Sequence, residues 1–275
     1  MTDKNHSEHP RRAGFVVIGN EVLDGVVLDT NSNWMEPRLT ALGLEMKMLV
    51  SVRDDLEEIG KALHFACENC DVVITTGGLG PTHDDMTLKA VARALGRELE
   101  LDEEALRIVE KQYRKLYEEE IVKSPEITKS RKKMAILPAG AEALNNSVGG
   151  APGVRLNHEG TTIFCLPGVP SELRFIFEES VLPWLEERIS QRYHETVVEF
   201  DTNDESTFAP AIDEVMKEYP DVYVKSMPKT YGTTWTLRVW ISARGEDSLE
   251  LEERVEKAVR KLEEVTGIKS SRADE

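Results

Sequence analysis

Basic residues are scarce in this 275-residue sequence: Lys and Arg number 34 against 51 for Asp and Glu, which gives a formal charge of −17. An electrostatic field of that sign repels nucleic acid and anionic lipid, so neither is an expected partner. The acid excess does not exclude a phosphorylated small ligand, because a metal ion or backbone N–H groups can supply positive potential locally.

Cysteine is also scarce, and long apolar runs are absent. Three cysteines, an odd number, do not form a disulfide framework. Cys67 and Cys70 form a C-x-x-C at the end of a predicted helix, so we expect buried packing rather than a zinc or redox site. No apolar stretch reaches transmembrane length, and residues 1–13 lack the apolar core of a signal peptide. We therefore expect a cytoplasmic protein.

Two common nucleotide-binding motifs are missing. The sequence has no G-x-x-x-x-G-K-[ST], which excludes a P-loop. Its G-G-L-G-P-T segment (77–82) does not match G-x-G-x-x-G and follows the third predicted strand, not the first. A dinucleotide site of the Rossmann type is therefore weakly supported.

Short apolar strands alternate with helices in the first two thirds of the chain. This order predicts a three-layer α/β domain with a parallel sheet covered by helices on both faces. The predicted strands are 15–18, 44–52, 71–75 and 161–166, and the predicted helices are 30–42, 54–67, 85–95, 102–120 and 171–185.

The pattern changes near residue 191. Predicted strands lie at 195–200, 222–226 and 233–243, and predicted helices at 206–219 and 249–265. This β-α-β-β-α order indicates a second, smaller α+β domain. We place the two domains at 13–190 and 191–275.

In open parallel sheets, ligands bind beyond the carboxyl ends of the strands. Glycines at these ends let backbone N–H groups approach phosphate oxygens. Carboxylates clustered there without matching Lys or Arg predict a bridging divalent cation. The candidates are Glu21 after the first strand, Asp54 and Asp55 after the second, Gly77, Gly78, Gly80, Thr82, Asp84 and Asp85 after the third, and Gly168, Ser171 and Glu172 after the strand at 161–166.

Several of these residues have a purely structural alternative. Asp54, Asp55 and Asp85 could each cap the helix that follows, because Asp is a preferred N-cap residue. Gly168 could simply form a turn. Glu21 follows a buried strand outside any helix-start pattern, so we interpret it as functional.

The order of the motifs resembles a known family. The matching segments are I-G-N-E-V-L-D-G (18–25), D-T-N (29–31), V-R-D-D (52–55), T-T-G-G-L-G-P-T-H-D-D-M-T (75–87), N-x-V-G-G-A-P-G (146–153) and L-P-G-V-P-S-E (166–172). Together they resemble the molybdopterin-binding (MoaB/Mog-like) domain, and most closely the amino-terminal domain of CinA proteins. Residues 195–266 resemble the KH-like domain that follows it in CinA.

The resemblance implies a function and roles for individual residues. Relatives that adenylylate the pterin need one Asp after the second strand and one in the glycine loop, which correspond to Asp54 and Asp85. CinA-type domains are linked to metal-dependent hydrolysis of ADP-ribose to AMP and ribose 5-phosphate. We therefore expect a pyrophosphatase acting on nucleoside diphosphate sugars.

In this hypothesis Asp54, Asp85 and Glu21 are catalytic, and Asp54, Asp84 and Asp85 hold Mg²⁺, Mn²⁺ or Co²⁺. The ligand contacts are Gly77, Gly78, Gly80, Thr82, Gly168, Ser171, Glu172 and, from the D-T-N motif, Asn31.

Two other functions stay open. The chain could bind or adenylylate molybdopterin in molybdenum cofactor metabolism, or it could be a non-catalytic interaction module. In either enzymatic case the ligand is a small nucleotide or pterin. The resemblance also implies a homo-oligomer.

RNA binding is not expected, because the G-x-x-G loop of KH domains is missing between residues 195 and 243. The deamidase domain that often follows in CinA has no counterpart in the sequence, so deamidation is not expected.

Overall fold

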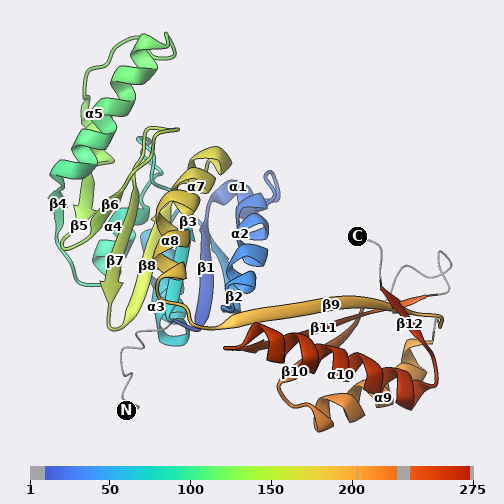
Figure 1. Cartoon of the computed structure of the whole chain (residues 1–275). Coiled ribbons are helices and arrows are strands. Elements are labelled where there is room, and N and C mark those ends of the chain that lie inside the picture. The colour runs from blue at the N-terminus through green and yellow to red at the C-terminus, as the bar shows by residue number, and fades with distance from the viewer. Residues whose placement is uncertain (1–9, 203, 228–235, 273–275) are drawn as a thin grey trace. The chain divides into compact units, whose positions relative to one another are not determined.

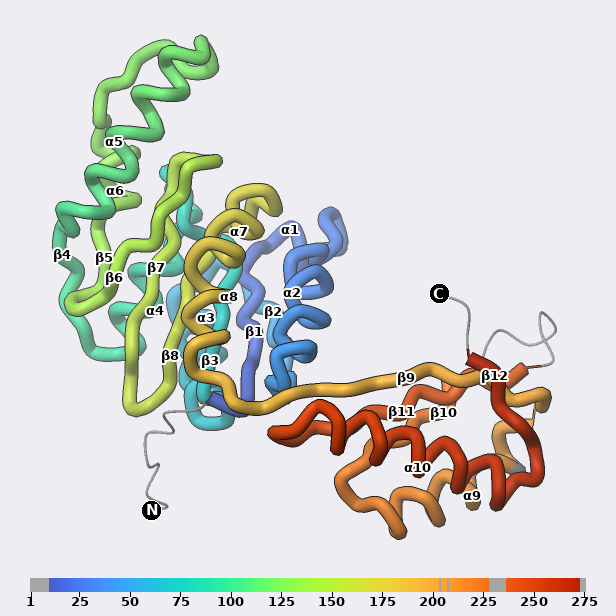
Figure 2. Tube along the Cα trace, viewed as in Figure 1, coloured from blue at the N-terminus to red at the C-terminus, as the bar shows by residue number. Residues whose placement is uncertain are grey.

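The chain folds into two compact units in the computed structural model, which describes residues 10–202, 204–227 and 236–272. The first unit comprises Met1–Thr40 and Leu44–Ile189, and the second comprises Ala41–Gly43 and Ser190–Glu275. Figure 2 follows the chain through both units from the amino to the carboxyl terminus.

A six-stranded sheet forms the centre of the first unit, with its strands in the order β2-β1-β3-β8-β7-β6 (Figure 1). The pairs β1–β2, β1–β3 and β3–β8 are parallel, whereas the pairs β8–β7 and β7–β6 are antiparallel. The predicted α/β fold is confirmed, with the refinement that its sheet is mixed. The strands are β1 Arg12–Ile18, β2 Glu45–Val52, β3 Val72–Thr76, β6 Glu142–Leu144, β7 Gly153–His158 and β8 Thr161–Leu166.

The antiparallel edge has a local cause that the sequence analysis overlooked. Strands β7 and β8 are joined through Glu159 and Gly160, which both have positive φ, at 45° and 85°. Two residues with positive φ between antiparallel strands form the tight hairpin turn whose twist matches that of the strands. The sequence pattern predicted β8 but not β7, the first strand of this hairpin.

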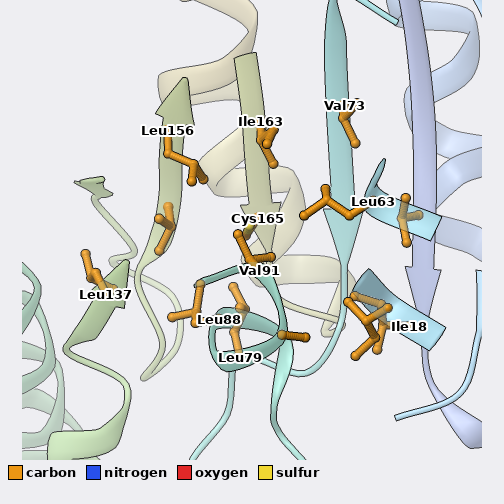
Figure 3. Packing of buried hydrophobic residues seen from close by; sticks show 14 of the residues in the cluster. Ile18, Leu63, Val73, Leu79, Leu88, Val91, Leu137, Leu156, Ile163 and Cys165 are labelled. Atoms are coloured by element: carbon orange, nitrogen blue, oxygen red, sulfur yellow. The ribbon is translucent and has the colours of Figure 1, made fainter. Parts of the chain in front are cut away.

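Helices cover both faces of the sheet because its central strands, β1, β3 and β8, are apolar on both sides. On one face, α3 (Leu56–Asn69) and α4 (Thr87–Ala94) enclose a core of aliphatic side chains. Figure 3 shows part of this core, with Ile18, Val73, Ile163 and Cys165 from the strands beside Leu63, Leu88 and Val91 from the helices. Cys67 and Cys70 are buried in the same cluster, as expected for packing residues.

The opposite face carries α2 (Thr30–Ala41) and the helical segment that follows β8. Phe164 of β8 packs edge-on against Trp184, with ring centroids 5.4 Å apart, and Trp34 of α2 packs in the same way against Phe177. This segment was predicted as one helix, but it is divided into α7 (Pro170–Ile176), a π-helical turn η1 (Phe177–Val181) and α8 (Leu182–Glu186). Pro183 lacks an N–H for the helical ladder, which explains an irregular turn just before it.

Shorter elements surround the edge of the sheet. Glu21 lies in a short helix, α1 (Asn20–Leu23), that the sequence did not predict. The remaining elements are β4 (Leu99–Leu101), α5 (Glu103–Glu118), α6 (Lys129–Lys133) and β5 (Ile136–Pro138), and β4 pairs with β5.

The second unit is an antiparallel sheet with helices packed on one face. Its strands follow the order β10-β11-β9-β12, and α9 (Glu205–Glu218) and α10 (Ser248–Thr266) share their apolar core. The expected small α+β architecture is present, whereas its likeness to KH domains stays a prediction. The strands are β9 Arg192–Phe200, β10 Val222–Met227, β11 Leu237–Gly245 and β12 Ser270–Arg272; residues 233–235 of the predicted strand 233–243 lie outside the described part.

Among the helices that the structure describes, none combines the length and the apolar character needed to cross a bilayer.

Candidate functional site

A hollow of about 600 Å³ opens where β1, β3 and β8 end. This volume is in the range of small-molecule sites. The predicted site residues Glu21, Asp54, Asp84, Asp85, Gly77, Gly78, Gly80, Gly168 and Glu172 all line it, together with the unpredicted Tyr113 and Met134. Strand order thus brings residues far apart in the sequence to one place, as the strand-end rule predicts.

Two positions of the glycine loop after β3, Gly77 and Gly78, accept only glycine. Gly77 and Gly78 have φ angles of +97° and +67°. A Cβ on Gly77 would lie 2.2 Å from the Ile18 carbonyl oxygen, and one on Gly78 would lie 2.2 Å from Thr87 Oγ1. The loop is anchored as well, since Gly77 N donates to Leu166 O at 3.0 Å and Thr87 Oγ1 donates to Gly77 O at 2.8 Å. Its backbone is therefore fixed before any ligand arrives.

Three successive N–H groups of this loop are available to a ligand. Within the described part of the chain, the N–H groups of Gly78, Leu79 and Gly80 donate to no protein acceptor. All three residues line the hollow. Backbone N–H groups need a partner, and a run of them in a loop forms an anion-binding concavity. The loop is suited to a phosphate.

Asp85 closes a turn within the glycine loop. Its Oδ2 accepts from Thr82 N at 2.8 Å and from Thr82 Oγ1 at 2.5 Å. The single hydroxyl proton of Thr82 is shared between Asp85 and Asp84, and the hydrogen bond with Asp84 is the main cause of the lowered pKa of Asp84. Helix α4 begins after Met86 without a side-chain cap. Asp85 is therefore not the N-cap that the alternative interpretation allowed.

The two aspartates after β2 have different roles. Asp55 is the N-cap of α3 and accepts from Glu57 N at 2.8 Å and Glu58 N at 3.0 Å, which lowers its pKa. Asp54 lines the hollow, and its Oδ2 accepts from Asn20 N at 3.0 Å. Asp55 therefore has a structural role as a helix cap, whereas Asp54 stays a candidate site residue.

Glu21 lines the hollow, but the reason for which we interpreted it as functional was wrong. We placed it outside any helix-start pattern, whereas it lies in the first turn of α1. Acidic residues are common in a first turn because they complement the helix dipole. Its position in the lining, rather than its local sequence, now supports a role at the site.

Glu172 is held at the site by a residue that the sequence analysis did not select. Asn146 is buried, and its Nδ2 donates to Glu172 Oε2 and to Ala151 O, both at 2.7 Å. Its Oδ1 accepts from Val148 N and Gly149 N. Burial raises the pKa of Glu172, and the hydrogen bond from Asn146 opposes this in part. The N-x-V-G-G motif therefore fixes the position of a half-buried carboxyl group.

Three predicted contact residues do not line the hollow. Asn31 is buried, and its Nδ2 donates to Gly168 O at 2.8 Å, so it supports the loop after β8. Thr82 forms the turn with Asp85. Ser171 is exposed in the first turn of α7.

Tyr113 of α5 and Met134 line the hollow without having been predicted. The Arg131 guanidinium lies 3.9 Å from the centre of the Tyr113 ring and fixes its face by a cation–π contact. No local motif marks either residue, because each reaches the site only through packing of the edge elements.

The predicted divalent-metal site is not supported. Among the residues that the structure describes, no group of three or more His, Cys, Asp or Glu side chains could hold a metal ion. Asp54, Asp84 and Asp85 line the same hollow, but N–H and O–H donors of Asn20 and Thr82 occupy oxygens of their carboxylates. The residues present do not fit the expected cation.

The fold and the hollow define an α/β ligand-binding protein with a rigid glycine loop at the end of its sheet. A family model described as "Probable molybdopterin binding domain" matches residues 14–187. The chain therefore belongs to this molybdopterin-binding-domain family.

Similar proteins extend over nearly the whole chain. A protein of Aeropyrum pernix is 43% identical over 263 residues, which cover 94% of this chain and 93% of its own. A protein of Sulfurisphaera tokodaii is 39% identical over 259 residues, covering 94% and 95%. Among solved structures, CinA of Thermoplasma acidophilum, described as of unknown function, is 36% identical with a TM-score of 0.57. It covers 62% of this chain and 96% of its own.

These comparisons correct the expected activity. We predicted a metal-dependent hydrolase of nucleoside diphosphate sugars such as ADP-ribose, and that prediction was wrong. The matching family is one of molybdopterin binding. The expected carboxylate cage for the metal is also missing among the described side chains. The alternative reading, a molybdopterin-binding protein, agrees better with both findings.

Proposed function

We propose that the hollow at the ends of β1, β3 and β8 binds a molybdopterin-type ligand, a reduced pterin that carries a phosphate. The observation that carries the proposal is the run of three residues, Gly78, Leu79 and Gly80, that line the hollow and whose N–H groups have no protein acceptor in the described structure. In this proposal they bind the phosphate. The family of the chain supports the pterin as the rest of the ligand.

The charges around the hollow support one orientation of this ligand. Glu21, Asp54, Asp84 and Asp85 line the hollow, and their carboxylates repel a phosphate. The phosphate is therefore directed to the backbone N–H groups. The pyrimidine edge of a pterin carries adjacent N–H donors, and a carboxylate accepts such a pair. We assign this contact to Glu172, which Asn146 holds in place.

A second candidate function is adenylylation of the bound ligand. It is favoured by the positions of Asp54 and Asp85, which come from two different strand ends and line one hollow. These are the positions that the resemblance to pterin-adenylylating relatives implies. Transfer of AMP from ATP to molybdopterin by the purified chain tests it. A chain that binds molybdopterin and transfers no AMP acts as a binding protein only.

Titration of the full chain with molybdopterin under anaerobic conditions tests the proposed binding. We expect saturable binding to the wild-type chain and to Gly96→Ala, and loss of binding in Gly78→Ala. Gly96 has a similar φ of +63°, but no atom lies within 4 Å of a Cβ built there. Absence of binding, or equal affinity in the two variants, would contradict the proposal. Homo-oligomerisation stays a separate prediction, which light scattering of the same sample checks.

A further inference from the structure

A second hollow, of about 490 Å³, adjoins the glycine loop and has the opposite charge. It shares Pro81 and Asp85 with the proposed pterin pocket. Its remaining walls come from α4, α6 and the starts of α3 and β5. The loop of residues 80–86 therefore borders two hollows, one acidic and one lined by lysines.

Three lysines face this second hollow. Lys89 projects from α4, and Lys129 and Lys133 are four residues apart and therefore share one face of α6. Among the described residues, Lys89 and Lys129 have no ion-pair partner, and Lys133 donates to the carbonyl oxygen of Thr82. In the described part of the chain, Lys89 and Lys129 thus have no carboxylate within ion-pair distance, whereas Lys133 lies near enough to Asp84 to help lower the pKa of that carboxyl. The charge of these lysines is available to an anion.

The floor of this hollow is apolar. Leu56, Met86 and Ile136 contribute apolar side chains to its lining. Asp85 is the acidic residue of the lining, and its Oδ2 is already engaged by Thr82. Lysines beside an apolar surface suit a ligand that has a phosphate at one end and a flat, weakly polar body at the other.

We propose that the hollow lined by Lys89, Lys129 and Lys133 is a second ligand site, which binds a nucleotide with its phosphate on the lysines and its base on the apolar floor. This site is distinct from the proposed pterin pocket and adjoins it at Pro81 and Asp85. One end of the nucleotide therefore lies beside the glycine loop. The lysines act as point charges, so binding weakens as salt rises.

Calorimetric titration of the full chain with AMP and with inorganic pyrophosphate, at low salt and without pterin, tests the proposal. We expect both probes to bind, and Lys129→Gln and Lys89→Gln to weaken each of them by about fivefold or more. Lys132→Gln is the matched control: it removes the same charge from the same helix, but Lys132 does not line the hollow. We expect it to change either affinity less than twofold.

Each other outcome overturns part or all of the proposal. No binding of either probe, or equal losses in Lys129→Gln and Lys132→Gln, would show that the hollow is not the site. Binding of pyrophosphate without AMP would contradict the nucleotide class. Pterin binding is measured in a separate titration with Gly78→Ala, so failure at either site is recognised independently of the other.

Discussion

Gly78 and Gly96 share a left-handed backbone but differ in their surroundings. A Cβ on Gly78 meets Thr87 Oγ1 at 2.2 Å, whereas one on Gly96 meets nothing within 4 Å. Alanine in this conformation costs about 1–2 kcal/mol, and overlap in a packed region adds about 1–3 kcal/mol. We expect Gly78→Ala to lower the free energy of unfolding by the sum of both effects and Gly96→Ala by the first alone. Denaturant unfolding measures the difference, and equal losses would refute the rigid-loop description.

The pH dependence of stability reports on Glu172. Burial raises its folded-state pKa above the ordinary value of 4.5, so the folded chain binds this proton more tightly than the unfolded chain does. Its contribution to stability is therefore fully present below the unfolded pKa and is lost as the pH rises through the folded pKa. We expect Glu172→Gln to remove this decline. The measurement is the free energy of unfolding of both proteins against pH, and parallel profiles across that window would contradict a raised pKa.

Part of the site could be predicted residue by residue. Asp54, Asp85 and the glycines Gly77 and Gly78 follow buried strands, and the ends of parallel strands meet at one edge. Asn146 could not be selected in the same way, because it follows a short antiparallel strand and acts through Glu172, 26 residues later. Tyr113 reaches the hollow from α5, and a helical pattern does not show what its faces will contact.

At the scale of elements, the end of the second unit depends on one carboxylate. Helix α10 ends at Thr266 with Gly267 as its C-cap. Glu263 accepts from Ser270 N and Ser270 Oγ, both at 2.9 Å, and from Lys269 Nζ at 2.8 Å. The Lys269 ammonium is the main cause that lowers the pKa of Glu263 to about 2. These bonds join strand β12 to α10, beside its pairing with β9.

We therefore expect Glu263→Ala to release β12. Amide hydrogen exchange should show protection at residues 270–272 falling by about tenfold or more. Glu253→Ala is the matched control, because Glu253 lies on the same helix and pairs with Lys257 at the exposed surface. We expect that variant to leave β12 unchanged. Similar loss of protection in both would assign the strand's stability to the helix as a whole.

The elements that were predicted well are those with a strong periodic pattern. The buried strands β1, β3 and β8 consist of apolar runs, and the helices α3 and α4 each have one apolar face. The elements missed were short or irregular: α1 has four residues, β12 has three, and the β7–β8 hairpin depends on the backbone of Glu159 and Gly160. The break at η1 follows from Pro183, but a pattern of apolar spacing continues across it.

At the scale of the whole molecule, net charge and local charge point in different directions. The formal charge of −17 predicts that anions are repelled, yet backbone N–H groups and the lysines Lys89, Lys129 and Lys133 supply positive potential around one loop. The family model covers residues 14–187, and thus the glycine loop and both hollows. Ligand binding should accordingly act on the first unit.

Hydrogen exchange of the full chain with and without molybdopterin tests the central claim most directly. The account predicts slower exchange in the glycine loop at 76–86 and in the facing segments 149–151 and 167–172, with no change across 192–272. Gly96→Ala should give the same pattern, and Gly78→Ala should give none. Unchanged exchange at 76–86 under saturating ligand, or protection confined to the second unit, would contradict it.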